Sequence, residues 1–268
     1  MKSESELSDI GRQIRFWRSK SGMSQLELAT AAETTPRYVS FVETGRSRPG
    51  QSVLLRIAKA MSLSARETNA MLRRAGFSAV HSEHAFDSEA VEPFRAAMVA
   101  VLSKHEPFPG CAFNSVGEVV LANEAFKRFA PDALTTSPEE RITRLFNPDG
   151  ELRAMFENWE EVVWSILDRQ KREYASTNHP QIAAQIEIGE RLLKDVPRLT
   201  ESGSEDQIVF SPRIRIGDRT ISTFTSIMRF ESASDVTLSE VRVELMFPAD
   251  QVSREFFEQS AASSVSIP

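Results

Sequence analysis

Residues 24–49, SQLELATAAETTPRYVSFVETGRSRP, determine the fold of the first part of the chain. Ser24 and Glu27 have the spacing of a capping box, in which a serine hydroxyl and a glutamate carboxylate satisfy backbone donors at the start of a helix. Thr35 and Pro36 then supply an N-cap and a proline at the first position of another helix. The sequence therefore predicts two short helices joined by a turn of a few residues.

Further helices are predicted on either side of this pair. One precedes it over about 8–20. After it, Gly45 ends the third helix, a fourth follows over about 52–61, and a second capping box at Ser64 starts a fifth helix that ends at Gly76. The helical spacing of the apolar residues predicts one shared core, formed by Ile10, Ile14, Trp17, Leu28, Ala29, Ala32, Leu54, Ile57, Ala58 and Met61.

Two short helices with a tight turn between them, the second opening on polar and basic side chains, have the layout of a helix-turn-helix. Residues 8–75 closely resemble the XRE-type, phage-repressor-like helix-turn-helix, from the Ser-Gln start to the Glu-x-Gly-x-x-x-Pro ending. The turn departs from the family pattern, because Glu33 stands where glycine is usual. A non-glycine residue in a left-handed conformation costs about 1 kcal/mol.

The resemblance implies that the third helix lies in the major groove of double-stranded DNA. We expect Arg37 to contact guanine, whereas Phe41 either packs on a thymine methyl group or against its own domain. Arg18 and Glu43 match an ion pair of the family that orients the third helix. The complete set of DNA-binding residues implied for bases and phosphates is Gln25, Thr35, Pro36, Arg37, Tyr38, Ser40, Phe41, Arg46 and Arg48.

The distribution of charge also favours a nucleic acid as the partner of the first module. The net charge of the chain is −6, but residues 1–76 hold 13 Lys and Arg against 7 Asp and Glu, a net charge of +6. The rest of the chain has a net charge of −12. Because a single module that neutralises a few phosphates binds weakly, we expect a homodimer on a palindromic site.

Length and composition exclude several other classes of protein. A chain of 268 residues, 41% of them hydrophobic, favours two folded domains. The single cysteine, Cys111, forms no intramolecular disulfide, and His81 and His84 alone do not make a metal site. No apolar run approaches the length of a membrane span or a signal peptide. We therefore expect a cytoplasmic protein with no metal, no cofactor and no membrane association.

Residues 77–90 are predicted to be a linker, and 91–259 a second domain followed by a flexible tail over 260–268. The domain begins with a helix over 91–104 and a hairpin of strands over 111–114 and 118–121, after which Asn123 caps a short helix. The remaining elements predicted are helices over 138–146, 151–174 and 180–194 and strands over 207–216, 220–230 and 241–246. This order predicts an α+β domain with helices packed on an antiparallel sheet.

Three stretches of this domain resemble the MmyB-like ligand-binding domain, a PAS-like fold found behind XRE-type modules in bacterial regulators. They are VVLANEAF, RITRLFNPDGELRAMFENWEE and SASDVTLSEVRVELMFPAD, and the resemblance spans residues 91–250. The family often carries a Phe-Gly-Thr-Pro-type turn where this chain has RFES at 229–232.

The resemblance implies a cavity for a small apolar ligand, such as a fatty-acyl compound. Arg144 either neutralises a ligand carboxylate or pairs with an acidic neighbour such as Asp149 or Glu151. Each apolar residue of the set has the alternative role of ordinary core. The candidate ligand-binding residues are Phe113, Asn123, Phe126, Arg144, Leu145, Trp159, Val163, Phe224, Ile227 and Met246.

These observations favour a one-component transcriptional regulator, in which ligand binding changes the geometry of the dimer. The alternative is a DNA-binding regulator whose second domain only dimerises or recruits a protein. An enzyme is disfavoured, because the sequence has no nucleophile elbow, no metal cluster and no glycine-rich phosphate loop.

Overall fold

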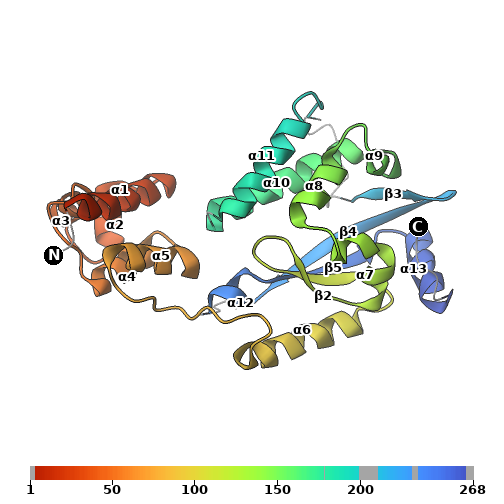
Figure 1. The fold of residues 1–268 in the computed structure, drawn as a ribbon, viewed down its shortest axis with the longest axis horizontal. Coiled ribbons are helices and arrows are strands. Elements are labelled where there is room, and N and C mark those ends of the chain that lie inside the picture. The colour runs from red at the N-terminus through yellow and green to blue at the C-terminus, as the bar shows by residue number, and fades with distance from the viewer. Residues whose placement is uncertain (1–3, 178, 199–210, 231–234, 264–268) are drawn as a thin grey trace. The chain divides into compact units, whose positions relative to one another are not determined.

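The computed structural model describes residues 4–177, 179–198, 211–230 and 235–263. The chain forms two compact units. The helical unit contains the chain up to Glu83 together with the short segment that ends at Val236, and the sheet unit contains the rest. Figure 1 labels the elements of both units.

The helical unit consists of α1 (Glu4–Lys20), α2 (Gln25–Ala31), α3 (Pro36–Glu43), α4 (Gln51–Ala60) and α5 (Ala65–Ala75). The predicted helices are thus confirmed, although α1 begins earlier than expected. Both predicted capping boxes are present, Thr35 caps α3 by accepting a hydrogen bond from the Tyr38 amide, and Gly76 ends α5 in a left-handed conformation.

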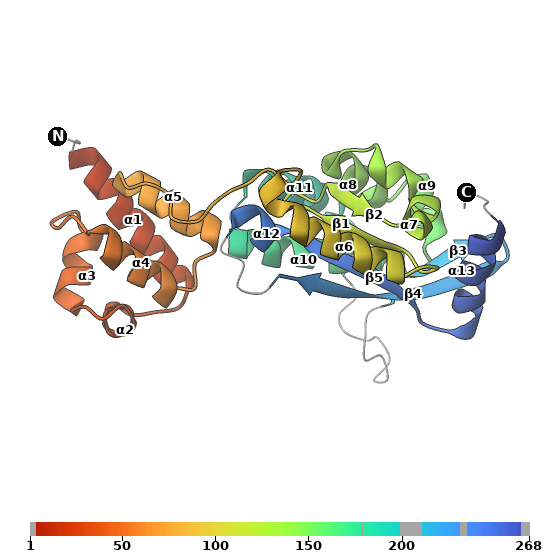
Figure 2. The same cartoon turned by 90° about the horizontal axis from the view of Figure 1, so that it is seen from below.

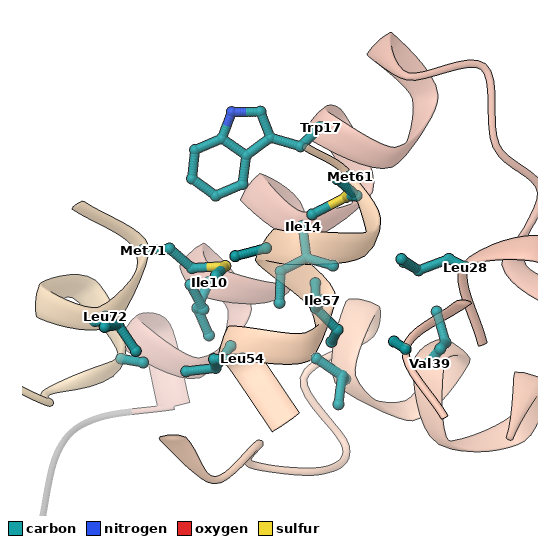
Figure 3. Close-up of a cluster of buried hydrophobic side chains, with 14 of the residues drawn as sticks. Ile10, Ile14, Trp17, Leu28, Val39, Leu54, Ile57, Met61, Met71 and Leu72 are labelled. Carbon is teal, nitrogen blue, oxygen red and sulfur yellow. The ribbon is translucent and has the colours of Figure 1, made fainter. Parts of the chain in front are cut away.

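One continuous apolar core holds these helices together (Figure 3). α1 contributes Ile10, Ile14 and Trp17, while the facing helices contribute Leu28, Val39 and other residues that the figure labels. Every residue predicted from helical spacing lies in this core.

The start of the predicted linker is attached to the helical unit. The Asn69 side chain on α5 is buried, and its Nδ2 donates to the His81 carbonyl at 2.8 Å. Its Oδ1 accepts from the amides of Val80 and His81, both at 3.1 Å. Phe77 also packs against the core. The packing of this unit therefore continues beyond the expected boundary at residue 76.

The sheet unit is built on a five-stranded antiparallel sheet with the order β2-β1-β5-β4-β3. Its strands are β1 (Gly110–Phe113), β2 (Val119–Ala122), β3 (Arg213–Ile216), β4 (Arg219–Arg229) and β5 (Arg242–Pro248). This arrangement confirms the predicted α+β class. Only the last residues of the strand expected over 207–216 are seen as β3, since 207–210 lie outside the described residues.

Helices cover both faces of this sheet (Figures 1 and 2). One face carries α6 (Glu92–Lys104), and the other carries α8 (Pro138–Phe146), α10 (Trp159–Thr177) and α11 (Pro180–Leu192). Because side chains alternate along a strand, Val243 of β5 packs with the α6 cluster, while its neighbour Arg242 faces α10. The unit is completed by α7 (Glu124–Phe129), α9 (Glu151–Met155), α13 (Gln251–Ser263) and all of α12 (Val236–Glu240) except Val236.

The single long helix predicted over 151–174 is wrong, because the structure has two helices there, α9 and α10. The intervening backbone pairs with β3 instead. Phe156 forms a β-bridge with Ile214, and the Glu157 amide donates to the Arg213 carbonyl at 2.9 Å. This pairing is long-range, so the helical spacing of the apolar residues gave no sign of it.

The predicted boundary at residue 259 falls inside α13, so residues 260–263 are helical rather than part of a tail. Phe257 of this helix is buried, and its ring contacts those of Phe108 and Phe129 edge to face. The rest of the predicted tail lies outside the described residues. α13 is thus an integral part of the sheet unit.

Candidate functional site

The first candidate site is the exposed surface of α3. Val39 and Val42 fix the inner face of this helix in the core. At its start, Thr35, Pro36 and Arg37 are exposed. Arg46 and Arg48 are exposed in the loop that follows, whereas Tyr38, Ser40 and Phe41 are half-buried. The predicted contact residues of α3 and its loop are therefore at least partly accessible.

Both aromatic residues predicted to read DNA contact their own domain. Tyr38 packs against the core. The Arg37 guanidinium lies over the Phe41 ring, 5.2 Å from its centroid, which is a cation–π contact. The sequence left two roles open for Phe41, packing on a thymine methyl group or packing against its own domain. In the structure its ring contacts Arg37 of the same helix.

The predicted pair of Arg18 and Glu43 is present and joins α1 to α3. Arg18 Nε donates to Glu43 Oε1 at 2.6 Å, and Nη2 donates to Oε2 at 3.0 Å. The two side chains are 12% and 2% exposed. The hydrogen bond to Glu43 raises the pKa of Arg18, so the guanidinium stays charged.

Gln25 belongs to the same network, which the sequence did not indicate. Its Nε2 donates to Glu43 Oε2 at 2.8 Å. The side chain predicted to hold a phosphate thus also connects α2 to α3. These two residues lie on different helices, so no local pattern in the sequence could have identified this contact.

The turn between α2 and α3 has the geometry that the sequence predicted. Glu33 has a φ of 51°, in the left-handed region. The next amide, that of Thr34, donates to the Ala29 carbonyl at 2.8 Å. The turn keeps its form without the usual glycine, at a conformational cost of about 1 kcal/mol.

The second candidate site consists of two cavities in the sheet unit. The first, here called the sheet cavity, has a volume of about 180 Å³ and lies between the sheet and helices α8, α10 and α11. Its wall is formed by Phe113, Ser115, Val116, Gly117, Pro138, Arg141, Ile142, Leu145, Ile166, Arg169, Gln170, Glu173, Ile182, Gln185 and Arg242.

The other cavity, here called the edge cavity, is larger, at about 450 Å³. It lies next to the edge strand β3, with α8, α9 and the segment 129–136 as its other walls. Its wall is formed by Phe129, Ala130, Pro131, Asp132, Ala133, Thr136, Arg141, Arg144, Leu145, Glu151, Leu152, Met155, Phe156, Ile214 and Ile216.

Three of the predicted ligand-binding residues line these cavities. Phe113 lines the sheet cavity, Arg144 lines the edge cavity and Leu145 lines both. Arg144 Nη1 donates to Asp132 Oδ2 at 2.9 Å, so an acidic neighbour other than the expected Asp149 or Glu151 pairs with it.

The other predicted ligand-binding residues line neither cavity. They are Asn123, Phe126, Trp159, Val163, Phe224, Ile227 and Met246.

Packing and hydrogen bonding explain where these side chains lie. Trp159 and Val163 are in the apolar cluster of the α8–α11 side, where Trp159 Nε1 donates to the Leu145 carbonyl at 2.7 Å. Asn123 caps α7, and its Nδ2 donates to the carbonyls of Leu102 and Phe108.

The other four residues also lie away from the two cavities. Phe126 is buried, and Phe224 stacks on Phe247 with their centroids 5.4 Å apart. Ile227 is 44% exposed, and Met246 pairs with β4 across the sheet.

Arg141 lines both cavities and was not singled out by the sequence. Its Nη1 donates to the carbonyls of Ala133 and Thr136, at 3.1 and 2.6 Å, and its Nη2 to that of Gly117. It is the first residue of the RITRLF motif, of which Arg144 was selected from the sequence as the candidate to bind a carboxylate. Burial lowers the pKa of Arg141.

Within the described residues, no three or more His, Cys, Asp or Glu side chains gather as metal ligands do. No described helix is long and apolar enough to cross a membrane. Cys111 is buried in the sheet, and this burial raises the pKa of its thiol, so the thiolate is disfavoured.

A helix-turn-helix with exposed cations, followed by a sheet unit with cavities, is the organisation of a DNA-binding transcriptional regulator with a ligand-binding domain. Comparison with protein families agrees. Residues 14–67 match the helix-turn-helix family, and residues 94–259 match the MmyB-like transcription regulator ligand binding domain. The chain therefore belongs to the MmyB-like family, with an XRE-type helix-turn-helix as its DNA-binding module. A search of curated proteins gave no match.

Proposed function

We propose that this regulator binds a palindromic operator as a homodimer and that a small apolar ligand in the sheet unit changes its affinity for that operator. The observation that supports operator binding most directly is the exposed, cationic start of α3, whose helix is fixed from behind by the core and by Glu43. Arg37 is at a position from which a recognition helix contacts guanine.

Arg46 and Arg48, in the loop that follows α3, would contact phosphates. Arg48 Nη2 also donates to the Ala75 carbonyl at 3.4 Å, which limits how freely this side chain moves. Because few phosphates are neutralised by one module, binding to two half-sites, about 34 Å apart, would supply the affinity of an operator complex.

A direct test of operator binding reverses the charge of Arg37 and Arg46. An operator selected in vitro from random duplexes would be bound by the wild-type protein and, much more weakly, by the double variant Arg37→Glu, Arg46→Glu. The matched control is Lys59→Glu, Arg73→Glu, which makes the same change of charge at exposed sites on α4 and α5. Equal retention of the operator by both double variants would refute the proposed surface.

The edge cavity is the better candidate for the apolar ligand. Its volume of about 450 Å³ is within the range of about 300–1,000 Å³ common for small-molecule sites, and Leu152, Met155, Phe156 and Ile214 give it an apolar wall. Arg144 would neutralise a carboxylate at the polar end. Such a ligand alters DNA binding only to the extent that it prefers one arrangement of the dimer.

Operator affinity measured with and without saturated fatty acids of increasing chain length tests this ligand. The variant Met155→Glu places a charge in the edge cavity and should abolish any response to these acids, while leaving operator binding in their absence unchanged. Identical operator affinities for the wild-type protein with every acid, together with native mass spectra that contain no bound lipid, would favour the alternative in which the sheet unit only dimerises or recruits a protein.

A further inference from the structure

The sheet cavity contains two glutamine side chains that form a directed chain of hydrogen bonds. Gln185 Nε2 donates to the Val116 carbonyl at 2.9 Å, and Gln170 Nε2 donates to Gln185 Oε1 at 2.9 Å. A backbone carbonyl only accepts hydrogen bonds, so the first bond fixes the orientation of the Gln185 amide. That orientation in turn fixes the amide of Gln170, whose oxygen is the free end of the chain.

This free end is a buried acceptor without a donor. Gln170 is 9% exposed, and its Oε1 accepts no hydrogen bond from the part of the chain that the structure describes. A buried polar atom left in this way costs about 1–3 kcal/mol, and native proteins rarely tolerate it. Because Gln170 lines the sheet cavity, a molecule in that cavity can supply the missing donor.

Most of the charge at the sheet cavity is balanced by ion pairs. Arg242 donates to Glu173 at 2.7 Å and to Glu244 at 2.9 Å, and Arg169 donates to Glu244 at 3.0 Å. Two guanidinium groups of the wall thus face two carboxylates, and Arg229 also donates to Glu173, at 3.4 Å. Arg242, which is 6% exposed, also lies over the ring of Phe113. Each of these charged groups therefore has a partner of opposite charge.

Arg141 adds a positive charge that these pairs do not balance. Its Nη1 and Nη2 donate to three neutral backbone carbonyls, those of Gly117, Ala133 and Thr136. Burial, the largest influence, lowers the pKa of Arg141 by more than the nearby Glu118 and Glu139 raise it. An anionic group in the cavity would compensate this charge, and a planar carboxylate matches the guanidinium fork.

We propose that the sheet cavity binds a small organic acid that carries a hydroxyl or amine group, in a site separate from the edge cavity. The carboxylate would face Arg141, and the hydroxyl or amine would donate to Gln170 Oε1. A volume of about 180 Å³ corresponds to about six water molecules, so the site suits acids of about three or four carbon atoms. This inference goes beyond the proposed function, since it requires neither operator binding nor an acyl ligand.

Isothermal titration calorimetry on the full-length protein tests this site with four probes. Lactate and serine carry both the carboxylate and the donor, propionate lacks the donor, and lactamide lacks the charge. We expect lactate or serine to bind at least about tenfold more tightly than propionate or lactamide. Equal affinities for lactate, serine and propionate, or no binding of any probe, would overturn the proposal, the second result indicating a cavity that holds only water.

A variant then locates the binding site. Gln170→Leu should remove the preference for lactate over propionate, whereas Gln181→Leu, at an exposed position on α11, should retain it. A preference that survives in Gln170→Leu would exclude the assigned acceptor. The wild-type comparison of the four probes remains decisive even if Gln170→Leu fails to fold. Operator retention, measured on the same samples, reports on the proposed function independently.

Discussion

The helical unit and the sheet unit of this protein are stabilised in different ways. The helical unit has one continuous core, and its buried ion pair is completed by Gln25. The sheet unit has separate apolar clusters on either face of its sheet and two cavities beside them. One continuous core suits a module that presents a rigid surface to DNA, whereas cavities beside the apolar clusters leave room for small molecules.

The largest difference between the two units is expected when the buried ion pair of the helical unit is removed. Glu43→Ala leaves Arg18 buried without its partner, and we expect a loss of about 3–5 kcal/mol in the stability of the helical unit. Hydrogen exchange measured peptide by peptide would register this loss in α3, with α10 unchanged.

Asp9→Ala is the matched control for this variant. Asp9 pairs with Arg12 and Arg74, but these side chains are about half exposed or more, so the loss should stay below about 1 kcal/mol. Similar losses in both variants would contradict the importance given to the buried pair.

Two helix glycines compare the tightness of packing in the two units. A Cβ atom on Gly11 would lie 2.5 Å from the Val42 carbonyl oxygen, and one on Gly189 would lie 2.9 Å from Phe146 Cε2. Alanine at either position should cost about 1–3 kcal/mol. Gly11→Ala should be the more destabilising, because a helix backbone cannot rotate away as a side chain can. Urea unfolding followed by peptide hydrogen exchange measures both, and the reverse order would contradict this reasoning.

Substitutions at two left-handed turn residues, one in each unit, should change the stability by smaller amounts and in opposite directions. Glu33→Gly removes the strain at a φ of 51°, and after the entropy cost of glycine we expect a gain of about 0.5 kcal/mol. Gly217→Ala puts a side chain on a left-handed residue, with a φ of 60° in the β3–β4 turn, and should lose about 1 kcal/mol of stability. The loss should be no larger, because no atom lies near enough to clash with the added Cβ. Thermal unfolding measures both changes, and a loss in Glu33→Gly would show that the Glu33 side chain has a stabilising role.

The smallest expected effect concerns Cys111 in the sheet unit. Its pKa is raised in the folded protein, chiefly by burial and then by Glu244, so only the unfolded thiol ionises near pH 8.5. The stability from this group is therefore complete well below that pH and is lost as the pH rises towards and beyond it, by about 0.4 kcal/mol between pH 7 and 8.5. Urea unfolding of the wild-type protein and Cys111→Ala at both pH values isolates this change. An equal pH response in the two proteins would contradict it.

Much of the helical unit could be predicted because its signals are local. Ser24 with Glu27, Ser64 with Glu67, and Thr35 with Pro36 are neighbours in sequence, and each pair fixes a helix start through hydrogen bonds or backbone geometry within one turn. The α3 surface followed from the resemblance once those helices were in place.

Which side chains line a cavity was predicted less well, because apolar residues look alike in sequence. Trp159 and Phe113 both appeared suitable to line a cavity, yet only Phe113 does so. Arg141 and Gln170 are polar residues of the sheet cavity, and they lie on the same helices as apolar residues that were predicted to bind the ligand. Their hydrogen bonds involve carbonyl and amide groups distant in sequence, so no local pattern identified them.

The amino-acid sequence by itself determined the starts of the capped helices of the first module, the distribution of charge and the order of the strands in the second, because capping and alternation act over a few residues. Only the tertiary structure decided that the backbone at Phe156 pairs with β3, that Gln25 joins the Arg18–Glu43 pair, and which side chains face a cavity. These contacts join residues far apart along the chain, so they exist only once the whole unit has folded.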